Sequence, residues 1–348
     1  MKIAKRGEDG QGEGYVRAPT MAEIAAARTR LAGTVRRTAV LRPEALAART
    51  GGVIALKCEQ FQATGAFKAR GATNAVRSLS REELARGVAT HSSGNHGAAL
   101  AWAAREAGAR AWIVMPENAV ASKRAAVRRL GAEVVDCGPT QTDRERRLAE
   151  VLEETGAVLV HPYDDARVIA GQATATVELL EAEPRIRRLL VPVGGGGLSA
   201  GAVLASRWLG REVEVVGVEP AGADDTRRSL EAGERIALER VETLADGLRA
   251  QVGAATFPVL QRGLADLVTV GDDDILGAMR WMADEAKLLI EPSSATVIAA
   301  LLAGAVPAAG EVTGAILSGG NVDFQGEAWT RSRSCGDTAG MTESPANT

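Results

Sequence analysis

Two segments of this chain run from a β-branched, apolar stretch straight into a glycine turn and then into an Ala-rich helical pattern. The first reads VATH followed by SSGNHGAALAWAAREAG, and the second reads LLVPV followed by GGGGLSAGAVLASRWLG. Other short apolar runs alternate with helical patterns in the same way, namely VIALKCE, RAWIVMP, AEVVDC, VEVVGVEP and AILSGG. This alternation predicts an α/β fold, in which two lobes contain parallel-rich sheets covered by helices. Ligands of such sheets bind at the carboxyl ends of strands, where both glycine turns fall.

Composition excludes several classes of function. With 348 residues, 46% of them hydrophobic, the chain is long enough to bury two cores. A formal charge of -3 gives no basic field, so nucleic acid is not an expected partner. The polar N-terminus lacks an apolar leader and no run is long enough to cross a bilayer, so we expect no membrane partner.

The three cysteines, Cys58, Cys137 and Cys335, are odd in number and widely spaced. That pattern suggests neither a disulfide framework nor a CxxC metal site, and it fits a reducing, cytoplasmic location. The first fifteen residues and the tail from Thr330 are polar, rich in Gly and Ser and without periodicity. We expect both ends to be disordered.

The segment VGGGGLSAG, residues 193–201, places four consecutive glycines between a strand and a helix. Because glycine has no side chain, the main-chain N–H groups of residues 194–197 can approach an anion closely, and the helix dipole favours negative charge there. The spacing matches neither GxxxxGK[ST] nor GxGxxG, which argues against a nucleotide site. The alternative is a flexible turn packed closely on a neighbouring helix.

Ser92, Ser93, Gly94, Asn95 and His96 form the second such turn. Their main-chain and side-chain donors at a helix N-terminus would bind a carboxylate well. An ordinary Ser/Asn helix cap is the simpler explanation for this turn taken alone.

Lys68 lies in QATGAFKARGATNAV, after Ala66 and Phe67 and at the opening of a helical pattern. A lone lysine is usually a solvated surface residue. Here it accompanies a phosphate cradle and a carboxylate-binding turn. These are the parts that a Schiff-base enzyme requires, in which the lysine amine binds an aldehyde cofactor covalently.

The sequence resembles the fold type II family of pyridoxal 5'-phosphate (PLP) enzymes, tryptophan synthase β-like, and within it the serine/threonine dehydratases and serine racemases. The resemblance runs from about Met21 to Phe324 and rests on motifs that occur in the family's order: LKCEQFQATGAFKARGA, THSSGNHGAALA, HPYDDARVIAGQATATVE, VPVGGGGLSAG, VEPAGADD, LADGL, LIEPSSA and LSGGNVD. It implies a large PLP-binding domain of residues 1–86 and 160–330, an inserted small domain of residues 87–159, a disordered tail of residues 331–348, and a homodimer.

The resemblance also implies residue roles around the cofactor. Asn95 would hydrogen-bond the ring's phenolic oxygen, and Ser318 would meet the pyridine nitrogen. A neutral hydroxyl at that nitrogen leaves the ring a weaker electron sink, which suits reactions whose leaving group departs quickly. The implied cofactor-binding residues are Lys68, Phe67, Asn95, Gly194, Gly195, Gly196, Gly197, Leu198 and Ser318.

Two residues would be catalytic by the same resemblance. Lys68 would act as the base on one face of the cofactor, and Ser93 would lie on the opposite face. The substrate's α-carboxylate would bind the turn formed by Ser92, Ser93, Asn95 and His96.

The loop VEPAGADD resembles the divalent-cation site of the racemase-like branch. Glu219, the main-chain carbonyl of Ala223 and Asp225 would be its protein ligands, and two carboxylates with a carbonyl suit Mg²⁺ or Ca²⁺. Without the resemblance, an acidic loop after a strand is the simpler explanation.

Two departures from the family pattern bear on the reaction. Ala66 stands where the family usually has Ser, so no role for that hydroxyl is carried over. Tyr163 follows His161-Pro162 where eukaryotic-type racemases usually have Asn, and dehydratases have an aromatic residue there. This difference favours elimination over racemisation.

We therefore expect a dehydratase (ammonia-lyase) that converts a small L-β-hydroxy amino acid such as serine, threonine or 3-hydroxyaspartate to a 2-oxo acid and ammonia. The nearest alternative is an amino-acid racemase on the same scaffold, and a second is a catalytically silent PLP-binding regulatory protein. Arg144 falls near the place where racemase-like members have a substrate-side arginine, and a cation there favours an acidic substrate. Arg146 and Arg147 are close by, and a solvated helix face is the alternative for all three.

Overall fold

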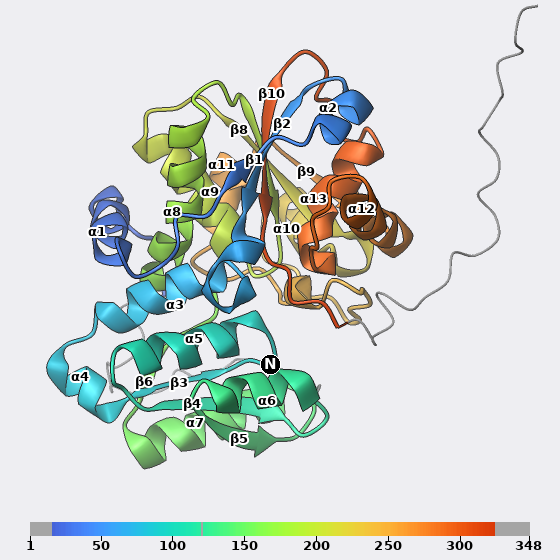
Figure 1. The fold of residues 1–348 in the computed structure, drawn as a ribbon. Helices are drawn as coiled ribbons and strands as arrows, with labels where there is room; N and C mark the ends of the chain where they lie inside the picture. Colours follow the sequence, from blue (N-terminus) through green and yellow to red (C-terminus); the bar gives the residue numbers. More distant parts are fainter. Residues whose placement is uncertain (1–15, 120, 324–348) are drawn as a thin grey trace, which may run out of the picture.

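Two sheets, both almost wholly parallel, organise the chain (Figure 1). The computed structural model describes residues 16–119 and 121–323, so the predicted tail of residues 331–348 lies outside the described part. Within it, only β1 runs antiparallel to its neighbour. The predicted α/β class with parallel-rich sheets is confirmed. In order across the larger sheet, the strands are β1 (Val40–Leu41), β2 (Val53–Cys58), β10 (Val312–Leu317), β7 (Arg188–Pro192), β8 (Glu214–Pro220) and β9 (Asp266–Val270).

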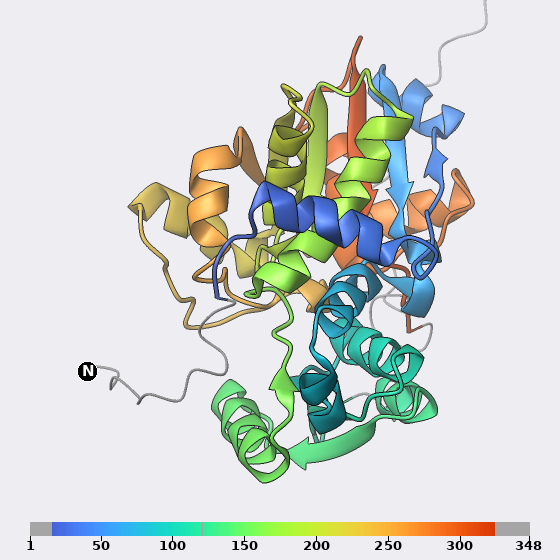
Figure 2. The ribbon, with the colours of Figure 1, turned by 90° about the vertical axis from the view of Figure 1, so that its left-hand side faces the viewer.

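Side chains of the larger sheet alternate between two apolar cores, because successive residues of a strand point to opposite faces. Leu189 and Val191 of β7 enter one core, whereas Leu190 enters the other. Figure 2 looks onto the face of the sheet to which Leu189 and Val191 point, where α1 lies across α8. The helices of this face are α1 (Met21–Leu31), α8 (Ala166–Ala182), α9 (Gly197–Trp208) and α11 (Phe257–Gly263), and those of the other are α2 (Glu44–Thr50), α12 (Asp272–Asp284) and α13 (Pro292–Leu302).

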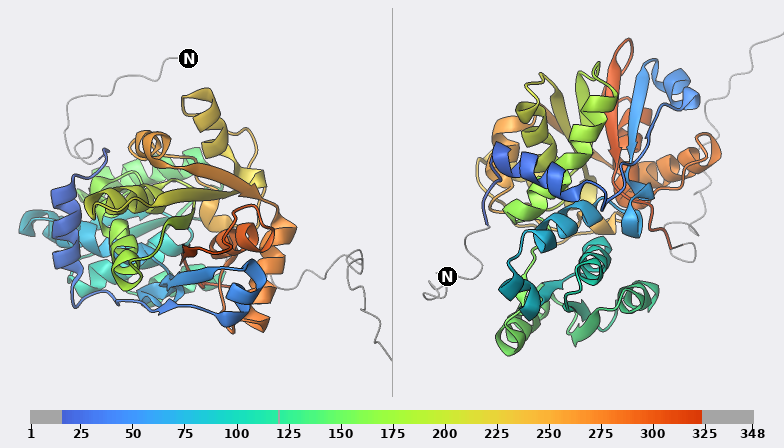
Figure 3. Two further views of the ribbon diagram at one scale, coloured as in Figure 1. Left: turned by 90° about the horizontal axis from the view of Figure 1, so that it is seen from above. Right: turned by 60° about the vertical axis from the view of Figure 1, so that its left-hand side comes forward.

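The smaller sheet lies below the larger one in every side view (Figures 1 to 3). Its core on one face is formed with α3, α5 and α6, and its core on the other face with α7. In order, its strands are β5 (Glu133–Cys137), β4 (Ala111–Pro116), β3 (Val88–His91) and β6 (Val158–Leu159), and the helices are α3 (Lys68–Arg77), α4 (Arg81–Arg86), α5 (Asn95–Glu106), α6 (Ala121–Arg129) and α7 (Gln141–Thr155).

The strands of the smaller sheet all fall within residues 88–159, and we propose that they mark the inserted small domain. Its apolar core also includes Ala72 and Val76 of α3. The packing of this lobe therefore begins before residue 87, the boundary that the resemblance implied.

The candidate residues follow the carboxyl ends of parallel strands, where ligands of α/β sheets bind. The glycine loop comes directly after β7, Ser318 after β10, and Ser92 after β3. Glu219 lies near the end of β8, just before α10 (Asp225–Ala232). Across the described residues, no helix combines the length and the apolar character needed to cross a bilayer.

Candidate active site

The glycine loop, residues 194–197, is fully buried between β7 and α9. Gly196 has a φ of 84°, which L side chains rarely adopt. None of the four main-chain N–H groups has an acceptor among the described residues. Buried N–H groups without acceptors are costly, and here they stand at the positive end of the α9 dipole. The loop therefore has the donors and the field that a phosphate group requires.

Neighbouring chain leaves no room for side chains in this loop. A Cβ on Gly195 would lie 2.4 Å from the ring of Tyr163, and one on Gly194 would lie 2.8 Å from Leu248 Cα. Leu198 is buried in the large core, so only its main chain faces the loop's ligand. Glycine is thus required by close packing as well as by anion binding.

Lys68 is the first residue of α3, and Phe67 precedes it as the N-cap. Its Nζ donates to the main-chain oxygen of Pro162 at 2.7 Å and lies 5.1 Å from the centroid of the Phe67 ring. Burial lowers the pKa of the Lys68 amine to about 8, although Glu291 opposes the shift. A lysine that loses its proton near pH 8 is a competent nucleophile and base.

Ser318 is held beside Lys68 by main-chain contacts. The N–H of Phe67 donates to the Ser318 oxygen at 2.9 Å, and Ala66 pairs with Gly319 in an isolated bridge. Ser318 is buried, yet its hydroxyl has no hydrogen bond to another described residue. That hydroxyl remains available for the ring nitrogen to which the resemblance assigns it.

Asn95 joins the two lobes at the first residue of α5. Its Nδ2 donates to both carboxyl oxygens of Glu291, at 2.8 and 3.1 Å, and its Oδ1 accepts from Asn321 Nδ2 at 2.8 Å. These bonds fix the orientation of the Asn95 amide, the group predicted to meet the ring's phenolic oxygen.

Glu291 is a buried carboxyl that the sequence analysis did not assign. It is the N-cap of α13, and burial, reinforced by Asp246, raises its pKa to about 7. The acid before Pro292 was visible within LIEPSSA. Its burial without an ion pair depends on Gly319, where a Cβ would lie 2.5 Å from Glu291 Oε1.

The turn at residues 92–96 opens α5 as predicted. The Ser92 hydroxyl accepts from the N–H of Gly94 at 3.3 Å, whereas the Ser93 hydroxyl has no hydrogen bond among the described residues. His96 differs, because its buried Nε2 donates to the main-chain oxygen of Val160 at 3.0 Å. Burial also holds the pKa of His96 well below its usual value. Only the main chain of His96 can therefore serve a carboxylate.

The loop after β6 forms another wall of the site. His161 Nδ1 accepts from the N–H of Asp164 at 2.8 Å, and burial lowers the pKa of His161 to about 4, so the ring is neutral at physiological pH. The Tyr163 ring stacks edge-on against His161 and lies over Gly195. Because Pro162 holds Lys68, this loop links the lysine to the glycine loop.

The predicted metal ligands Glu219, Ala223 and Asp225 are all buried. Glu219 accepts from two main-chain N–H groups of α10, and Asp225 accepts from the N–H of Val252 at 2.8 Å. Burial raises the pKa of Glu219 to about 8 and that of Asp225 to about 6. Neither carboxyl has an ion pair among the described residues, and these residues contain no cluster of three or more His, Cys, Asp or Glu side chains suited to a metal.

The three arginines near the start of α7 differ in their partners. Arg146 pairs with Asp143, and Arg147 pairs with acids farther along α7. Among the described residues, Arg144 has no ion pair and its shielded Nε lacks a partner. Burial lowers the pKa of His91, the last residue of β3, and Arg144 adds to that shift. Arg144 therefore lies within electrostatic reach of the strand that enters the substrate turn.

These residues fit PLP on observations of the structure itself. Donors without acceptors in residues 194–197 match a phosphate, and the Ser318 hydroxyl is free for a ring nitrogen. The Lys68 amine, with its pKa lowered to about 8, suits covalent attachment to an aldehyde.

Comparison with known proteins agrees with this fit. Residues 31–319 match the family described as "Pyridoxal-phosphate dependent enzyme". The chain is 43% identical over 311 residues to the serine racemase of Arabidopsis thaliana, covering 88% of this chain and 94% of the relative. It is 40% identical to the beta-hydroxyaspartate dehydratase of Paracoccus denitrificans, covering 89% and 99%. The structure of maize serine racemase superposes with a TM-score of 0.86 at 41% identity, covering 88% and 95%.

Proposed function

The chain belongs to the pyridoxal-phosphate dependent enzyme family of fold type II, and on this premise we propose that it is a dehydratase (ammonia-lyase). Its substrate is a small L-β-hydroxy amino acid, and its products are a 2-oxo acid and ammonia. The observation that carries this proposal is the Lys68 amine, held at Pro162 beside a loop whose four N–H groups have no acceptor in the described part of the chain.

We assign the cofactor contacts as follows. Lys68 holds PLP covalently, residues 194–197 bind its phosphate, Asn95 its phenolic oxygen and Ser318 its ring nitrogen. When bound, the pyridine ring withdraws the electrons that are released as the substrate's α-proton departs. The Phe67 ring lies beneath the Lys68 amine, 5.1 Å from Nζ, and Leu198 contributes its main chain.

The protein's own groups then divide the work of elimination. The Ser92 to Asn95 turn holds the α-carboxylate, and the main-chain N–H of His96 adds a donor. Lys68 takes the α-proton from one face, because its low pKa makes the neutral amine available near neutral pH. The neutral ring of His161 and the Tyr163 ring form a largely shielded wall that limits water at the reacting centre.

Among candidate substrates, 3-hydroxyaspartate is favoured by Arg144. Of the three guanidinium groups at the start of α7, this one alone has no ion pair within residues 16–119 and 121–323, and a second substrate carboxylate would satisfy it. A relative of nearly the same length is named beta-hydroxyaspartate dehydratase. Serine and threonine lack that carboxylate, so we expect them to be poorer substrates.

Racemisation is the alternative reaction on the same site. It requires a proton donor on the face opposite Lys68, and the Ser93 hydroxyl has no hydrogen bond to any other residue that the structure describes. Relatives named serine racemase support this second activity. We place it below elimination because, by the family resemblance, Tyr163 stands where eukaryotic-type racemases usually have Asn.

We also propose that Glu219, the Ala223 carbonyl and Asp225 bind Mg²⁺ or Ca²⁺. Two buried carboxylates without a cation are costly, and their raised pKa values reflect that cost. The Val252-Gly253 segment connects this loop to the active site, since Asp225 accepts from Val252 and the Gly253 N–H donates to the Gly195 oxygen. A cation here would stabilise the phosphate loop indirectly.

We further propose a cytoplasmic homodimer. Cys58 and Cys137 are both buried free thiols, as in a reducing compartment. Phe61 and Leu289 are 46% and 48% exposed. They lie on neighbouring segments, since Gly320 packs between Gln60 and the Leu289 oxygen. Exposed apolar side chains on neighbouring segments support an interface at this face.

The lysine assignment is tested by reducing the holoenzyme with borohydride and mapping the pyridoxyl-labelled peptide by mass spectrometry. We expect the label on Lys68 and its loss in Lys68→Ala. Lys123→Ala is the matched control, because Lys123 pairs with Asp246 on the surface. A label on Lys123 or on the ion-paired Lys57 would overturn the assignment.

A further inference from the structure

Four charged side chains lie together in the interior behind Lys68. We name Lys57, Glu59, Arg70 and Glu178 the buried quartet. The side chains of Lys57, Glu59 and Arg70 are 0% exposed and that of Glu178 is 15% exposed. Two positive and two negative charges make the quartet neutral. Lys57 pairs with Glu178 at 2.6 Å, and Arg70 pairs with both acids at 2.7 Å.

Arg70 is the hub of the quartet. Its Nε and Nη2 donate to the two oxygens of Glu59 at 2.7 and 2.8 Å, and its Nη1 and Nη2 donate to those of Glu178 at 2.7 and 2.8 Å. Longer bonds reach the Thr174 hydroxyl and the Arg36 carbonyl, both at 3.2 Å. The planar guanidinium thus binds two carboxylates side-on, which a lysine ammonium cannot do.

Three members of the quartet, Glu59, Arg70 and Glu178, lie on segments that continue along the chain to different parts of the active site. Glu59 stands at the end of β2, before the loop that reaches Phe67. Arg70 lies two residues after Lys68, on a nearly opposite face of α3 because each helical residue turns by about 100°. Glu178 belongs to α8, which follows the loop containing Pro162. The quartet therefore joins the segments that carry Phe67, Lys68 and Pro162, on the side of α3 away from the lysine amine.

The two helices of the quartet also cross in near contact. A Cβ on Gly171 of α8 would lie 2.6 Å from the Arg70 oxygen and 2.7 Å from Gly71 Cα. Backbones this close leave little freedom for sliding. The first turn of α3 could still move by rotating or by fraying, and the hydrogen bonds of Arg70 oppose both motions.

We propose that Arg70 is a positioning residue for Lys68: by clamping Glu59 and Glu178 it fixes the first turn of α3, and with it the place of the lysine amine at Pro162. This inference rests on the proposed role of Lys68. Arg70 itself touches neither substrate nor cofactor.

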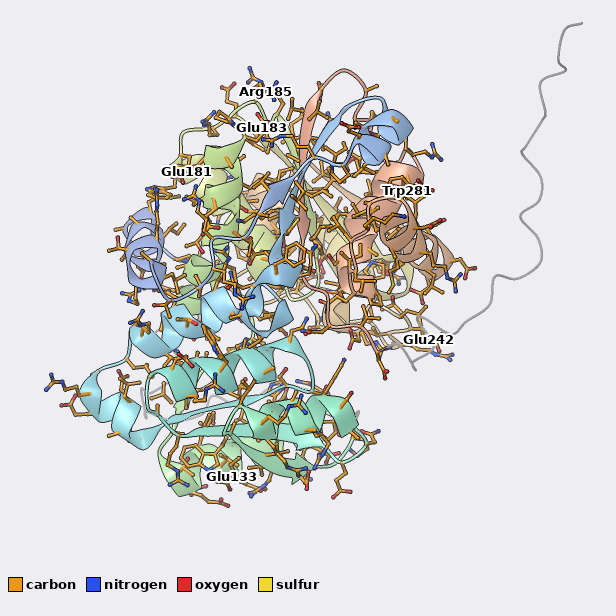
Figure 4. The ribbon with its side chains drawn as sticks, viewed as in Figure 1. Glu133, Glu181, Glu183, Arg185, Glu242 and Trp281 are labelled. Atoms are coloured by element: carbon orange, nitrogen blue, oxygen red, sulfur yellow. The ribbon has the colours of Figure 1, made fainter. Side chains whose placement is uncertain are left out.

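Stability alone is a weak reason for such a quartet. Burying charges costs solvation, and apolar residues of similar volume often serve stability as well. Surface pairs such as Arg240 with Glu242, the latter labelled at the periphery in Figure 4, avoid that cost because both side chains are largely exposed, at 80% and 64%. The quartet also fixes the orientation of α3, because the bidentate bonds of Arg70 are directional.

The test compares Arg70→Lys with Lys57→Met in the full-length enzyme. Arg70→Lys keeps the charge but loses the two-sided clamp on α3. Lys57→Met removes a buried charge whose hydrogen bonds go to Thr38 and Glu178 and not to α3. Both should lower the Tm, so stability alone cannot separate them.

Three readouts separate positioning from support. We expect Arg70→Lys to lower kcat about tenfold with KM within about twofold, because small misplacements of a reacting group are costly. In the apoenzyme, amides of residues 68–73 should exchange hydrogen at least about tenfold faster. The pH midpoint of the bound cofactor's absorption band should also shift. Lys57→Met should leave all three close to those of the parent.

If kcat, amide exchange and the pH midpoint changed equally in the two variants, the quartet would only stabilise the fold, and the proposal would be overturned. Unchanged readouts in Arg70→Lys would overturn it as well. Failure of the proposed function is distinguishable, because borohydride would then label a lysine other than Lys68 in the parent enzyme as well.

Discussion

The Nζ of Lys68 donates a 2.7 Å hydrogen bond to the main-chain oxygen of Pro162, which is 94 residues away in the sequence. The bond joins the start of α3 to the loop between β6 and α8. Burial of the amine lowers the pKa of Lys68 to about 8, although the carboxyl of Glu291 opposes the shift. The contact fixes the direction of the amine, and burial favours its neutral form.

Cofactor uptake should follow the protonation of Lys68. Only the neutral amine attacks an aldehyde, so the rate at which apoenzyme binds PLP should rise with pH through about 8 and then level off. Stopped-flow absorbance at a series of pH values measures this rate. A rate that keeps rising to the pKa of an ordinary lysine would show that the amine is not desolvated as the structure indicates.

The positions of the glycine loop, the Ser92 turn and Ser318 could be predicted from the sequence, because each follows a strand whose apolar pattern is local. Lys68 was also predictable, through its motif. Glu291 was not assigned, since its burial depends on Gly319, Asn95 and Asn321, which come from separate parts of the chain.

Two further features depend on packing between distant segments and so could not be predicted from the sequence. His96 has the right position in the turn, but whether its ring faces substrate or Val160 depends on β6. The small-lobe core recruits Ala72 and Val76 from α3, which no local pattern marks as belonging to that lobe.

The proposed cation should change how the free energy of unfolding depends on pH. Glu219 has a folded-state pKa raised to about 8, above its unfolded value, so the folded state binds more protons between about pH 4.5 and 8. In metal-free protein, the free energy of unfolding contributed by this group therefore falls as pH rises through that window. Adding Mg²⁺ or Ca²⁺ should restore stability at the upper end, where the carboxylate is charged.

Thermal unfolding with EDTA, and with each metal added back, measures this effect between pH 5 and 8.5. Glu219→Gln is the matched variant, which should be insensitive to the metal and lose the part of the pH dependence between about pH 6 and 8, leaving the part that Asp225 contributes at lower pH. If the parent also ignores EDTA at every pH, residues 219–225 are an acidic loop only.

Arg144 should control selectivity for acidic substrates. Arg144→Met is expected to lower kcat/KM for L-threo-3-hydroxyaspartate by about 10- to 100-fold, the loss typical of a charge-assisted hydrogen bond worth about 1.5–3 kcal/mol. Activity on L-serine should change little. Arg146→Met is the control, because Arg146 is exposed and paired with Asp143. Equal losses on both substrates would assign Arg144 to the fold of α7 instead.

The central claim, elimination from an L-β-hydroxy amino acid, depends on which face of the cofactor has a usable proton. Lys68 alone suffices to take the α-proton, whereas racemisation also needs Ser93 to return one from the other face. Ser93→Ala should therefore reduce racemisation, and turnover of the D-enantiomer, far more than elimination from the L-form. The decisive measurement follows 2-oxo acid, ammonia and the chirality of the remaining amino acid in one reaction of purified enzyme with L-threo-3-hydroxyaspartate, L-serine or L-threonine. We expect 2-oxo acid and ammonia in equal amounts as the main products, whereas D-amino acid accumulating faster than 2-oxo acid would show that racemisation is the main reaction.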